Sequence, residues 1–256
     1  MVVPGTGRMF DWHAHGVTDR GLQRRRNEDA LLVAPASRIC AVADGMGGHA
    51  AGDVASRLAV ETLEAAFQRP PSPRIRVPAL SRRLHDVFEA ANRAILEHAA
   101  TNRQCYGMGT TMTALSPLVI EPRCVIAHIG DSRAYRFRRG ELVQLTRDHT
   151  WVQTQVDSGI LTPLQARHHK LSSMLTRVLG THEAGPADIV ESDVESGDLF
   201  LLCSDGVTTM LDDADLRLLL DVALPLDQLA AALVAEANRR GGADNITVVL
   251  AQASAA

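Results

Sequence analysis

The sequence has few cysteines and no apolar run long enough to cross a membrane. Its four cysteines, at positions 40, 105, 124 and 203, lack C-x-x-C spacing, and three of them lie in apolar runs. None is followed by arginine six residues later, which excludes catalysis by a C-x5-R thiol. We therefore expect small core residues in a reducing compartment, not a zinc site or a disulfide framework.

A secretory signal and a strong basic charge are also missing. Residues 1–16 contain no continuous apolar segment of the kind that a signal peptide carries. The formal net charge of −4 does not indicate a basic surface that binds nucleic acid. The short basic cluster 136–139 is interpreted as a solvated turn or strand edge. No heptad seam or large exposed apolar helix face is evident. We expect a soluble, cytoplasmic, monomeric protein without nucleic-acid or membrane partners.

With 256 residues, 46% of them hydrophobic, the chain can bury a sizeable core, and we treat residues 1–256 as one domain. After a polar entry, apolar runs predict strands over 30–33, 39–43, 110–120, 123–129, 134–137, 189–194, 199–203 and 246–251. Helical spacing predicts helices over 50–67, 80–98, 212–222 and 226–240, with a proline-rich connector over 69–78 and a mobile flap over about 148–180. Clustered strands and paired helices favour an α+β fold of antiparallel sheets covered by helices.

Four aspartates stand at the ends of apolar runs. They are Asp44, Asp131 and Asp205, which close such runs, and Asp244, which opens the last one. Carboxylates at the mouths of packed strands would repel one another at neutral pH unless cations lay between them. We therefore predict a site for hard divalent metals that prefer oxygen ligands.

The glycine-rich stretch 44–50 follows a predicted strand and opens a predicted helix. Its spelling Gly45-x-Gly47-x-x-Ala50 matches the dinucleotide fingerprint. Charge argues against a nucleotide, because Asp44 would face the pyrophosphate and no acidic residue follows a second strand to hold the ribose. The competing interpretation is that the glycines let the carbonyl of Gly45 turn toward a cation that Asp44 holds.

A second constellation is Arg24-x-x-Asn27-Glu28-Asp29. One interpretation is a charged loop before a strand. The functional interpretation is that the two adjacent acids supply water-mediated metal ligation, while the guanidinium offers a planar fork to phosphate. Since three arginines follow one another over 24–26, the choice of Arg24 rests on its register with the acids.

The remaining polar candidates have structural interpretations. His128 lies in a predicted strand and is interpreted as a packed core residue. His149 and the pair 168–169 fall in loops, where we expect surface solvation. Asp213-x-Asp215 spells the D-x-D of phosphoaspartate hydrolases, but its place at a helix start is better explained by the helix dipole.

Six motifs occur in order along the chain: Arg24-x-x-Asn27-Glu28-Asp29, Asp44-Gly45-Met46-Gly47-Gly48-His49, Gly109-Thr110-Thr111, Gly130-Asp131-Ser132-Arg133-Ala134-Tyr135, Ser204-Asp205-Gly206 and Asp244-Asn245-Ile246-Thr247. Together they resemble the PP2C (PPM) family of metal-dependent protein serine/threonine phosphatases, in its compact bacterial form. The motifs span about 16–251. The resemblance implies a four-layer α-β-β-α sandwich, in which two mainly antiparallel sheets are flanked by helix pairs.

The resemblance also implies a ligand set for two core ions, Mn²⁺ or Mg²⁺. Asp44 would bridge the two ions, and Gly45 would offer its carbonyl to one of them. Asp205 and Asp244 would complete the coordination of the other ion. Asp131 resembles the residue that, with Asp205, holds a third metal in bacterial relatives.

Three further roles follow from the same resemblance. Glu28 would act through a metal-bound water, with Asp29 behind the direct ligands, and Arg24 would bind the substrate phosphate. Met46 stands where animal members carry a histidine assigned as general acid, so the group that protonates the leaving oxygen is unassigned. Residues 169–172 lack the proline and the basic residue usual after the flap histidine.

The implied activity is hydrolysis of phosphoserine and phosphothreonine in proteins by a metal-activated water. The implied partners are phosphorylated proteins and a Hanks-type Ser/Thr kinase whose action the enzyme would oppose, in some relatives in the control of type VI secretion. The alternative is a non-catalytic PP2C-like regulatory binding module. Such a module would have lost one or more metal carboxylates, whereas each matched position here is filled.

Overall fold

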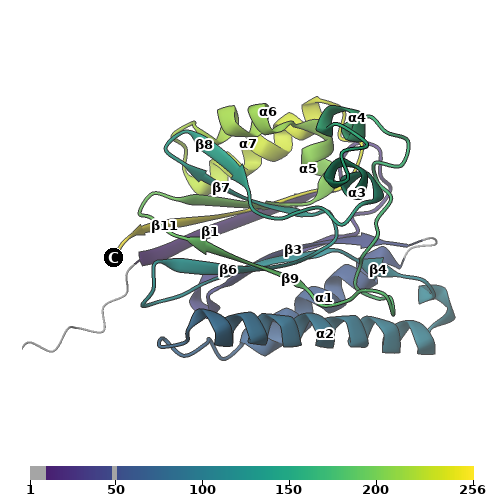
Figure 1. The fold of residues 1–256 in the computed structure, drawn as a ribbon, viewed down its shortest axis with the longest axis horizontal. Coiled ribbons are helices and arrows are strands. Elements are labelled where there is room, and N and C mark those ends of the chain that lie inside the picture. Colours follow the sequence, from purple (N-terminus) through teal and green to yellow (C-terminus); the bar gives the residue numbers. More distant parts are fainter. Residues whose placement is uncertain (1–9, 48–50) are drawn as a thin grey trace, which may run out of the picture.

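A computed structural model describes residues 10–47 and 51–256 of the chain. Two antiparallel sheets stack face to face, with helices on both outer surfaces (Figure 1). This is the predicted α+β, four-layer α-β-β-α arrangement. Every strand pairing among the described residues is antiparallel, in agreement with the clustered strands of the sequence.

The first sheet has the order β1-β11-β10-β7-β8. Its strands are β1 (Phe10–Asp19), β11 (Ile246–Ala255), β10 (Leu199–Cys203), β7 (Arg133–Arg138) and β8 (Glu141–Gln144). The second sheet has the order β2-β3-β5-β6-β9, and β4 pairs with β3. Its strands are β2 (Asp29–Ala34), β3 (Ile39–Met46), β4 (Gly109–Thr110), β5 (Met112–Pro117), β6 (Arg123–Ile129) and β9 (Asp188–Asp193).

Helices cover the outer face of each sheet. The second sheet packs against α1 (Gly52–Phe67) and α2 (Val77–Thr101), and the first against α5 (Asp205–Met210), α6 (Asp213–Leu220) and α7 (Leu226–Arg239). Two short 3-10 turns are η1 (Pro35–Ser37) and η2 (Arg103–Cys105). Among the described residues, no helix combines the length and the apolar character needed to span a bilayer.

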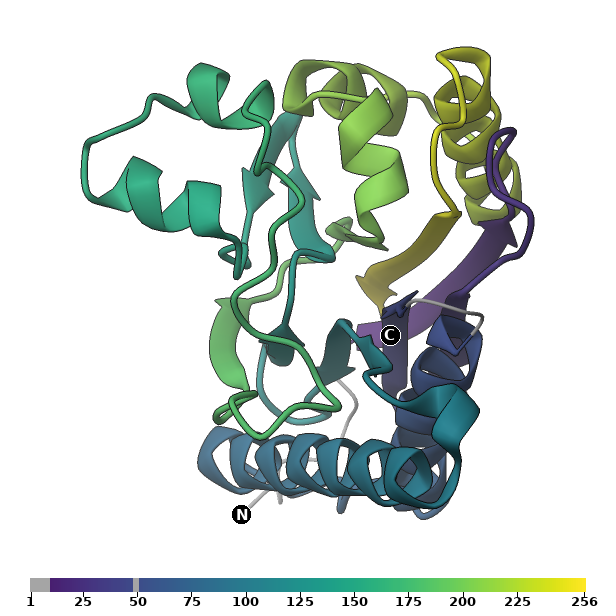
Figure 2. The same cartoon turned by 90° about the vertical axis from the view of Figure 1, so that its right-hand side faces the viewer.

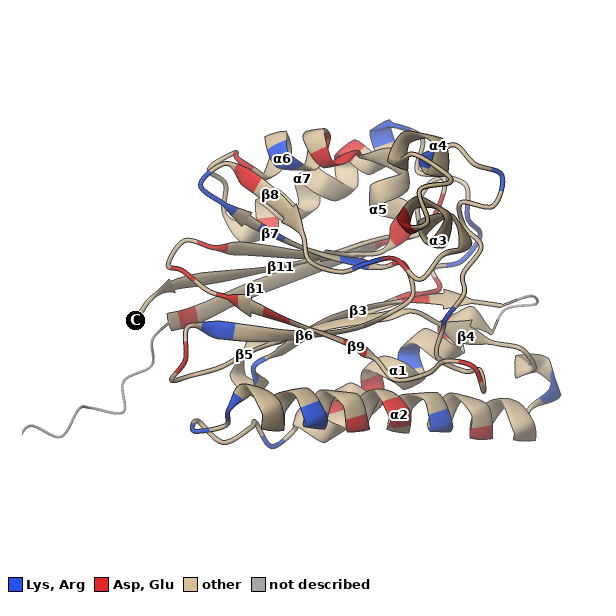
Figure 3. Cartoon of the chain, in the orientation of Figure 1, with Lys and Arg blue, Asp and Glu red and all other residues tan. Residues whose placement is uncertain are grey.

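The central strands are mainly apolar because both of their faces are covered. In β3, Ile39 and Ala41 face the helices α1 and α2, while Cys40 and Val42 face the opposite sheet. This alternation follows from the two-residue period of a strand. Three of the four cysteines are buried and all four are free, which confirms their interpretation as core residues, except that Cys105 is only partly buried. In Figure 3 most charged residues lie on helices, loops and strand ends.

Two elements differ from the sequence prediction. The polar entry contains β1, which pairs with β11 along its whole length. Its partly exposed edge position explains the charged and polar residues that hid it, among them Asp11 and His13. The short helix α5 begins directly at Asp205 and was also missed, because Gly206 and its β-branched neighbours are weak helix formers.

The predicted flap over 148–180 contains two helices, α3 (Trp151–Asp157) and α4 (Pro163–Arg167). Figure 2 shows these helices projecting from the side of the sandwich. The two ends of the segment meet, since Thr150 bridges Leu175. Mobility of the segment stays a prediction.

The basic cluster 136–139 is only partly the solvated edge that we expected, since Arg139 is exposed whereas Arg136 and Arg138 are mostly covered. Arg138 donates from Nε and Nη2 to the two carboxylate oxygens of Asp198, each at 2.6 Å. The Asp198 side chain is fully buried, and its Oδ2 also accepts from the backbone of Glu195. A buried carboxylate with a bidentate arginine partner is a structural ion pair that fixes the end of β7 against the turn before β10.

This ion pair gives a stability prediction with a neighbouring control. Arg138→Met leaves the buried Asp198 carboxylate unpaired and should lower the free energy of unfolding by about 3–5 kcal/mol. Arg139→Met removes a side chain that is 80% exposed and contacts Glu195, so it should change that energy by less than about 1 kcal/mol. Urea denaturation measures both values, and similar losses for the two variants would contradict the assignment.

Candidate metal centre

The main chain of Asp44 is held in place by hydrogen bonds to Thr110 and Thr111. It lies near the end of β3, where Thr111 donates its N–H to the Asp44 carbonyl at 2.9 Å and accepts the Asp44 N–H on Oγ1 at 3.0 Å. Thr110 adds a third bond, from Oγ1 to the same carbonyl at 2.9 Å. The Gly-Thr-Thr motif therefore clamps the main chain of Asp44, which fixes where its carboxylate can point.

Gly45 permits a close backbone approach next to Asp44. A Cβ at this position would lie 2.1 Å from the carbonyl oxygen of Gly52 and 2.5 Å from that of Glu28. Contacts this short exclude any side chain. The resulting packing brings the start of α1 and the backbone of Glu28 against β3. Gly48, His49 and Ala50, the rest of this motif, lie outside the described residues.

Asp29 joins the two sheets. It stands directly opposite Asp44 in the pairing of β2 with β3. Its Oδ2 accepts hydrogen bonds from Ser204 Oγ at 2.7 Å, directly after β10, and from Thr247 Oγ1 at 2.6 Å, on β11 of the other sheet. Burial raises the pKa of Asp29 to about 7, although these two hydroxyls act in the opposite direction.

Asp205 and Asp244 meet at the opposite side of the site. Asp205 opens α5 directly after β10, and Gly206 packs so tightly that a Cβ there would lie 1.9 Å from the Asn245 carbonyl oxygen. Asp244 precedes β11, and its Oδ2 accepts from Arg24 Nη2 at 2.5 Å. Arg24 is thus the arginine of the 24–26 cluster that contacts a predicted ligand, while its side chain stays 54% exposed.

Asn245 is a positioning residue to which the sequence analysis gave no role. Its Oδ1 accepts the Glu28 N–H at 2.8 Å, and its Nδ2 donates to the carbonyls of Arg20 and Arg26, also at 2.8 Å. One buried amide thereby holds the loop that carries Arg24 and Glu28 against the start of β11. Its place directly after Asp244, at a strand start, was the available signal.

Asp131 reaches the same end of the molecule from β6. The hydroxyl of Ser132, the next residue, lies 2.6 Å from Thr111 Oγ1, which also accepts the Asp44 N–H. Asp131 is therefore linked to Asp44 through two hydroxyl groups. Burial raises its pKa well above the usual range, and Asp205 raises it further.

The electrostatics of the cluster fit divalent cations. Burial raises the pKa of Asp44 well above its ordinary value, and Asp29, Asp205, Asp131 and Asp244 each add to that rise. Burial also raises the pKa of Asp205, and so does Asp244. Mutual repulsion of this kind is relieved by a positive charge between the carboxylates.

Two further observations support the fit. Oδ1 of Asp205 and Oδ1 of Asp29 are buried, and neither has a hydrogen-bond partner in the described part of the chain. Buried carboxylate oxygens without a partner are unusual in folded proteins and often mark an ion site. The donors are all oxygens, which suits Mn²⁺ or Mg²⁺ better than zinc. Burial also raises the pKa of Glu28, at the rim of the cluster, and neighbouring Asp53 contributes to that rise.

The histidines divide into confirmed and wrong interpretations. His128 is fully buried and hydrogen-bonds Thr113 Oγ1 through Nδ1 at 2.8 Å, so it is the packed residue that we predicted. His168 is exposed, as expected. His149 is not solvated but only 4% exposed, because contacts with Gly130 and distant flap residues enclose it. The Asp213-x-Asp215 interpretation is confirmed, since Asp215 completes a capping box at the start of α6.

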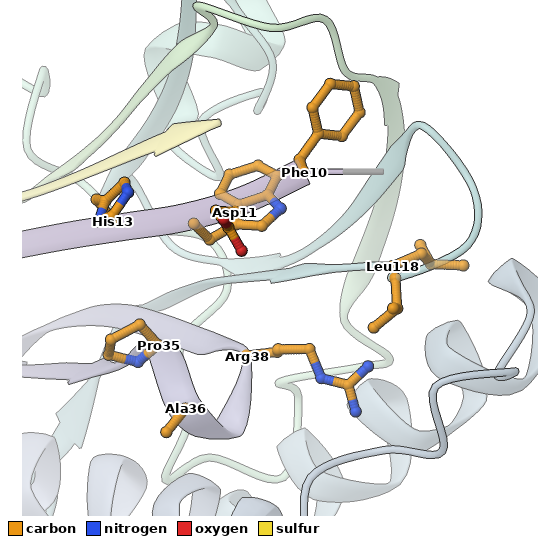
Figure 4. Close-up of a pocket in the computed structure, with 9 residues that line it drawn as sticks. Phe10, Asp11, His13, Pro35, Ala36, Arg38 and Leu118 are labelled. Atoms are coloured by element: carbon orange, nitrogen blue, oxygen red, sulfur yellow. The ribbon is translucent and has the colours of Figure 1, made fainter. Parts of the chain in front are cut away.

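A pocket of about 270 Å³ lies at the other end of the strands (Figure 4). It is lined by the first residues of β1, by η1 and by the turn after β5. The carboxylates lie near the last residues of β1 and β3, so this pocket is separate from the metal centre.

Comparison with models of known protein families identifies the family of this chain. The family profile described as protein phosphatase 2C matches residues 23–250, which is most of the chain. The chain belongs to the protein phosphatase 2C family. The six motifs and the clustered carboxylates thus lie in a fold that this family shares.

Individual relatives in the family are bacterial proteins. The chain is 41% identical over 234 residues to the serine/threonine protein phosphatase PstP of Mycobacterium tuberculosis, a match that covers 91% of this chain and only 43% of PstP. It is 35% identical to the serine/threonine phosphatase stp of Listeria innocua, covering 94% of this chain and 95% of that protein. A crystal structure of the PstP catalytic domain in complex with two manganese ions matches with a TM-score of 0.85 and 37% identity, covering 96% of this chain and 99% of that one.

The raised pKa values predict how the metal-free protein responds to pH. Carboxylates whose folded-state pKa is raised contribute stability that is complete below their unfolded pKa of about 4 and is lost as pH rises through the folded pKa, about 7 for Asp29. In EDTA, Asp44→Asn should therefore be more stable than the wild type, by a margin that grows between about pH 5 and about pH 8.

Chemical denaturation of the wild type and of Asp44→Asn across this pH range measures the difference between their free energies of unfolding. The difference between the proteins is the informative quantity, because the lowered pKa values of the buried His128 and His149 make both proteins lose stability below about pH 6.5. A margin that does not change with pH would contradict the predicted repulsion.

Proposed function

We propose that this protein is a metal-dependent protein serine/threonine phosphatase. The observation that carries the proposal is the group of partly or fully buried carboxylates from both sheets, whose pKa values are raised by burial and by neighbouring carboxylates. Similarity to proteins named as serine/threonine phosphatases supports it. The manganese ions of the PstP structure support the choice of metal.

Two core cations, Mn²⁺ or Mg²⁺, would be held by Asp44 between them, by the Gly45 carbonyl, and by Asp205 and Asp244. Glu28 would act through water and Asp29 from behind the direct ligands, where its hydroxyl partners fix its orientation. Asp131 would hold a third ion together with Asp205. When bound, such cations lower the pKa of a water between them and neutralise charge on a phosphoryl group.

Arg24 would bind the substrate phosphate. Its half-exposed guanidinium lies against Asp244 at the edge of the cluster, so it can reach both the carboxylates and a ligand that arrives from solvent. A guanidinium presents paired N–H donors that match phosphate oxygens. With Asp244 engaged as a ligand, those donors would orient the phosphorus for in-line attack.

The substrates would be proteins phosphorylated on serine or threonine, and a Hanks-type kinase would supply them. The non-catalytic alternative finds no support here, because each carboxylate that the resemblance assigns to the metals is present, and Asp29, Asp131, Asp205 and Asp244 each raise the pKa of Asp44. We further propose that the protein acts as a monomer in the cytoplasm.

Chelation tests the metal requirement. The purified protein should hydrolyse p-nitrophenyl phosphate and phosphothreonine peptides in Mn²⁺ and lose this activity in EDTA. Asp244→Asn should remain folded but lose about two or more orders of magnitude in kcat, because it removes a metal ligand. Far-UV circular dichroism checks the fold, and full activity in EDTA would refute the proposal.

The arginine cluster allows a matched test of phosphate binding. Arg24→Ala should lower kcat/KM by about tenfold to a hundredfold, in line with the loss of a charge-assisted contact worth about 1.5–3 kcal/mol. Arg25→Ala removes the adjacent arginine, which is exposed and forms no ion pair within the described part of the chain, and should change kcat/KM by less than about threefold. Steady-state kinetics on a phosphopeptide gives both ratios, and the assignment of Arg24 fails if Arg25→Ala has the larger effect.

A further inference from the structure

The flap segment over 148–180 is closed at its base by a short backbone ladder. Thr176 donates its N–H to the carbonyl of His149 at 2.8 Å, and Trp151 donates to Met174 at 2.8 Å. Between them, Thr150 bridges Leu175. The two ends of the flap segment are therefore joined at its base, and His149 is part of that junction.

His149 forms two hydrogen bonds with Gly130, the residue before Asp131. Its backbone N–H donates to the Gly130 carbonyl at 2.7 Å, and its ring nitrogen Nδ1 accepts the Gly130 N–H at 3.0 Å. Gly130 has φ of +108°, and a Cβ there would lie 2.4 Å from Thr111 Cγ2. Only glycine fits this bend, so both peptide groups around it have fixed directions at the point where the chain turns toward Asp131.

The other ring nitrogen of His149 faces Asp188, at the start of β9, and Arg177 of the flap segment. Nε2 lies 3.2 Å from Asp188 Oδ2, and Arg177 donates from Nη1 to Asp188 Oδ1 at 2.7 Å. Because Nδ1 accepts from Gly130, the proton of the neutral ring is on Nε2 and is donated to Asp188. The 2.9 Å approach of Arg177 Nη1 to Nε2 is then a contact between two donors, not a hydrogen bond.

We infer that His149 is a positioning residue that transmits the placement of the flap to Asp131 through the Gly130 peptide. This inference rests on the proposed function, in which Asp131 is a metal ligand. The ring is suited to the task because its two nitrogens contact different segments, Gly130 on the metal side and Asp188 on the side of Arg177 and the flap.

The competing explanation is packing alone. His149 is almost fully buried and its ring lies 4.8 Å from that of His128, so any substitution removes contacts. Two substitutions separate the explanations. In His149→Asn the side-chain oxygen can occupy the place of Nδ1 and accept from Gly130, whereas in His149→Gln the amide reaches the place of Nε2 and leaves Gly130 without its acceptor.

Amide hydrogen exchange of Gly130, measured in EDTA, reports directly on the hydrogen bond from Gly130 to His149 and does not depend on enzymatic activity. Exchange should be slow in the wild type and in His149→Asn, and faster by about fivefold or more in His149→Gln, the factor that corresponds to a lost bond worth about 1 kcal/mol. Equal acceleration in both variants would overturn the inference in favour of packing.

A double-mutant cycle with Asp131→Ala tests the path to the metal centre. His149→Gln should lower kcat in Mn²⁺ by about tenfold, the lower end of effects seen when the partner of a metal ligand is removed, and His149→Asn should recover most of that loss. In the Asp131→Ala background, His149→Gln should have little further effect, because both changes disable the same ligand. Independent losses that multiply would overturn the inference.

Failure of the proposed function would give a different result from failure of the inference about His149. A wild-type protein without Mn²⁺-dependent activity would remove the proposed function, whereas an active wild type with multiplying losses would remove only the role of His149. Calorimetric titration with Mn²⁺ adds a second readout. His149→Gln should weaken the same binding step that Asp131→Ala removes, and loss of all Mn²⁺ binding in His149→Gln would overturn the selective role.

Discussion

Repulsion between buried carboxylates is the constraint around which this molecule is built. Asp44, Asp205 and Asp244 come from three strand ends in two sheets. Asp205 and Asp244 both raise the pKa of Asp44, and Asp244 also raises the pKa of Asp205. In a medium of low dielectric such a cluster is unfavourable without cations. The folding free energy therefore comes from elsewhere, from the two helix–sheet layers and the central layer between the sheets.

The cluster persists because backbone contacts leave it no room to relax. The threonines of the Gly-Thr-Thr motif hold the main chain of Asp44, and Asn245 satisfies three groups of a loop more than 200 residues away in sequence. Gly45 and Gly206 allow approaches that any side chain would block. Rigid placement of ligands by fully satisfied polar groups is what a metal site needs, since a loose shell lets like charges move apart.

The sequence was most informative where both faces of a strand are buried. The strands Arg123–Ile129 and Leu199–Cys203 have the bounds that the sequence predicted for them. Edge strand β1 was missed because its exposed residues are polar, and α5 because six residues carry little helical periodicity. The aspartates could be predicted from their place at strand ends. His149 could not, since the residues that bury it lie 19 to 39 positions away and leave no local pattern.

The same long-range contacts tie the flap to the metal centre at two points. Thr110, beside the clamp on Asp44, exchanges both backbone hydrogen bonds with Leu179, and Gly130, before Asp131, exchanges bonds with His149. A flap that shifts when a phosphoprotein arrives must break these bonds or carry the ligand-bearing segments with it. Each bond contributes about 1 kcal/mol, so the two points couple flap and metal site by a few kcal/mol at most. Coupling of this size would tune ligand placement without making it all-or-none.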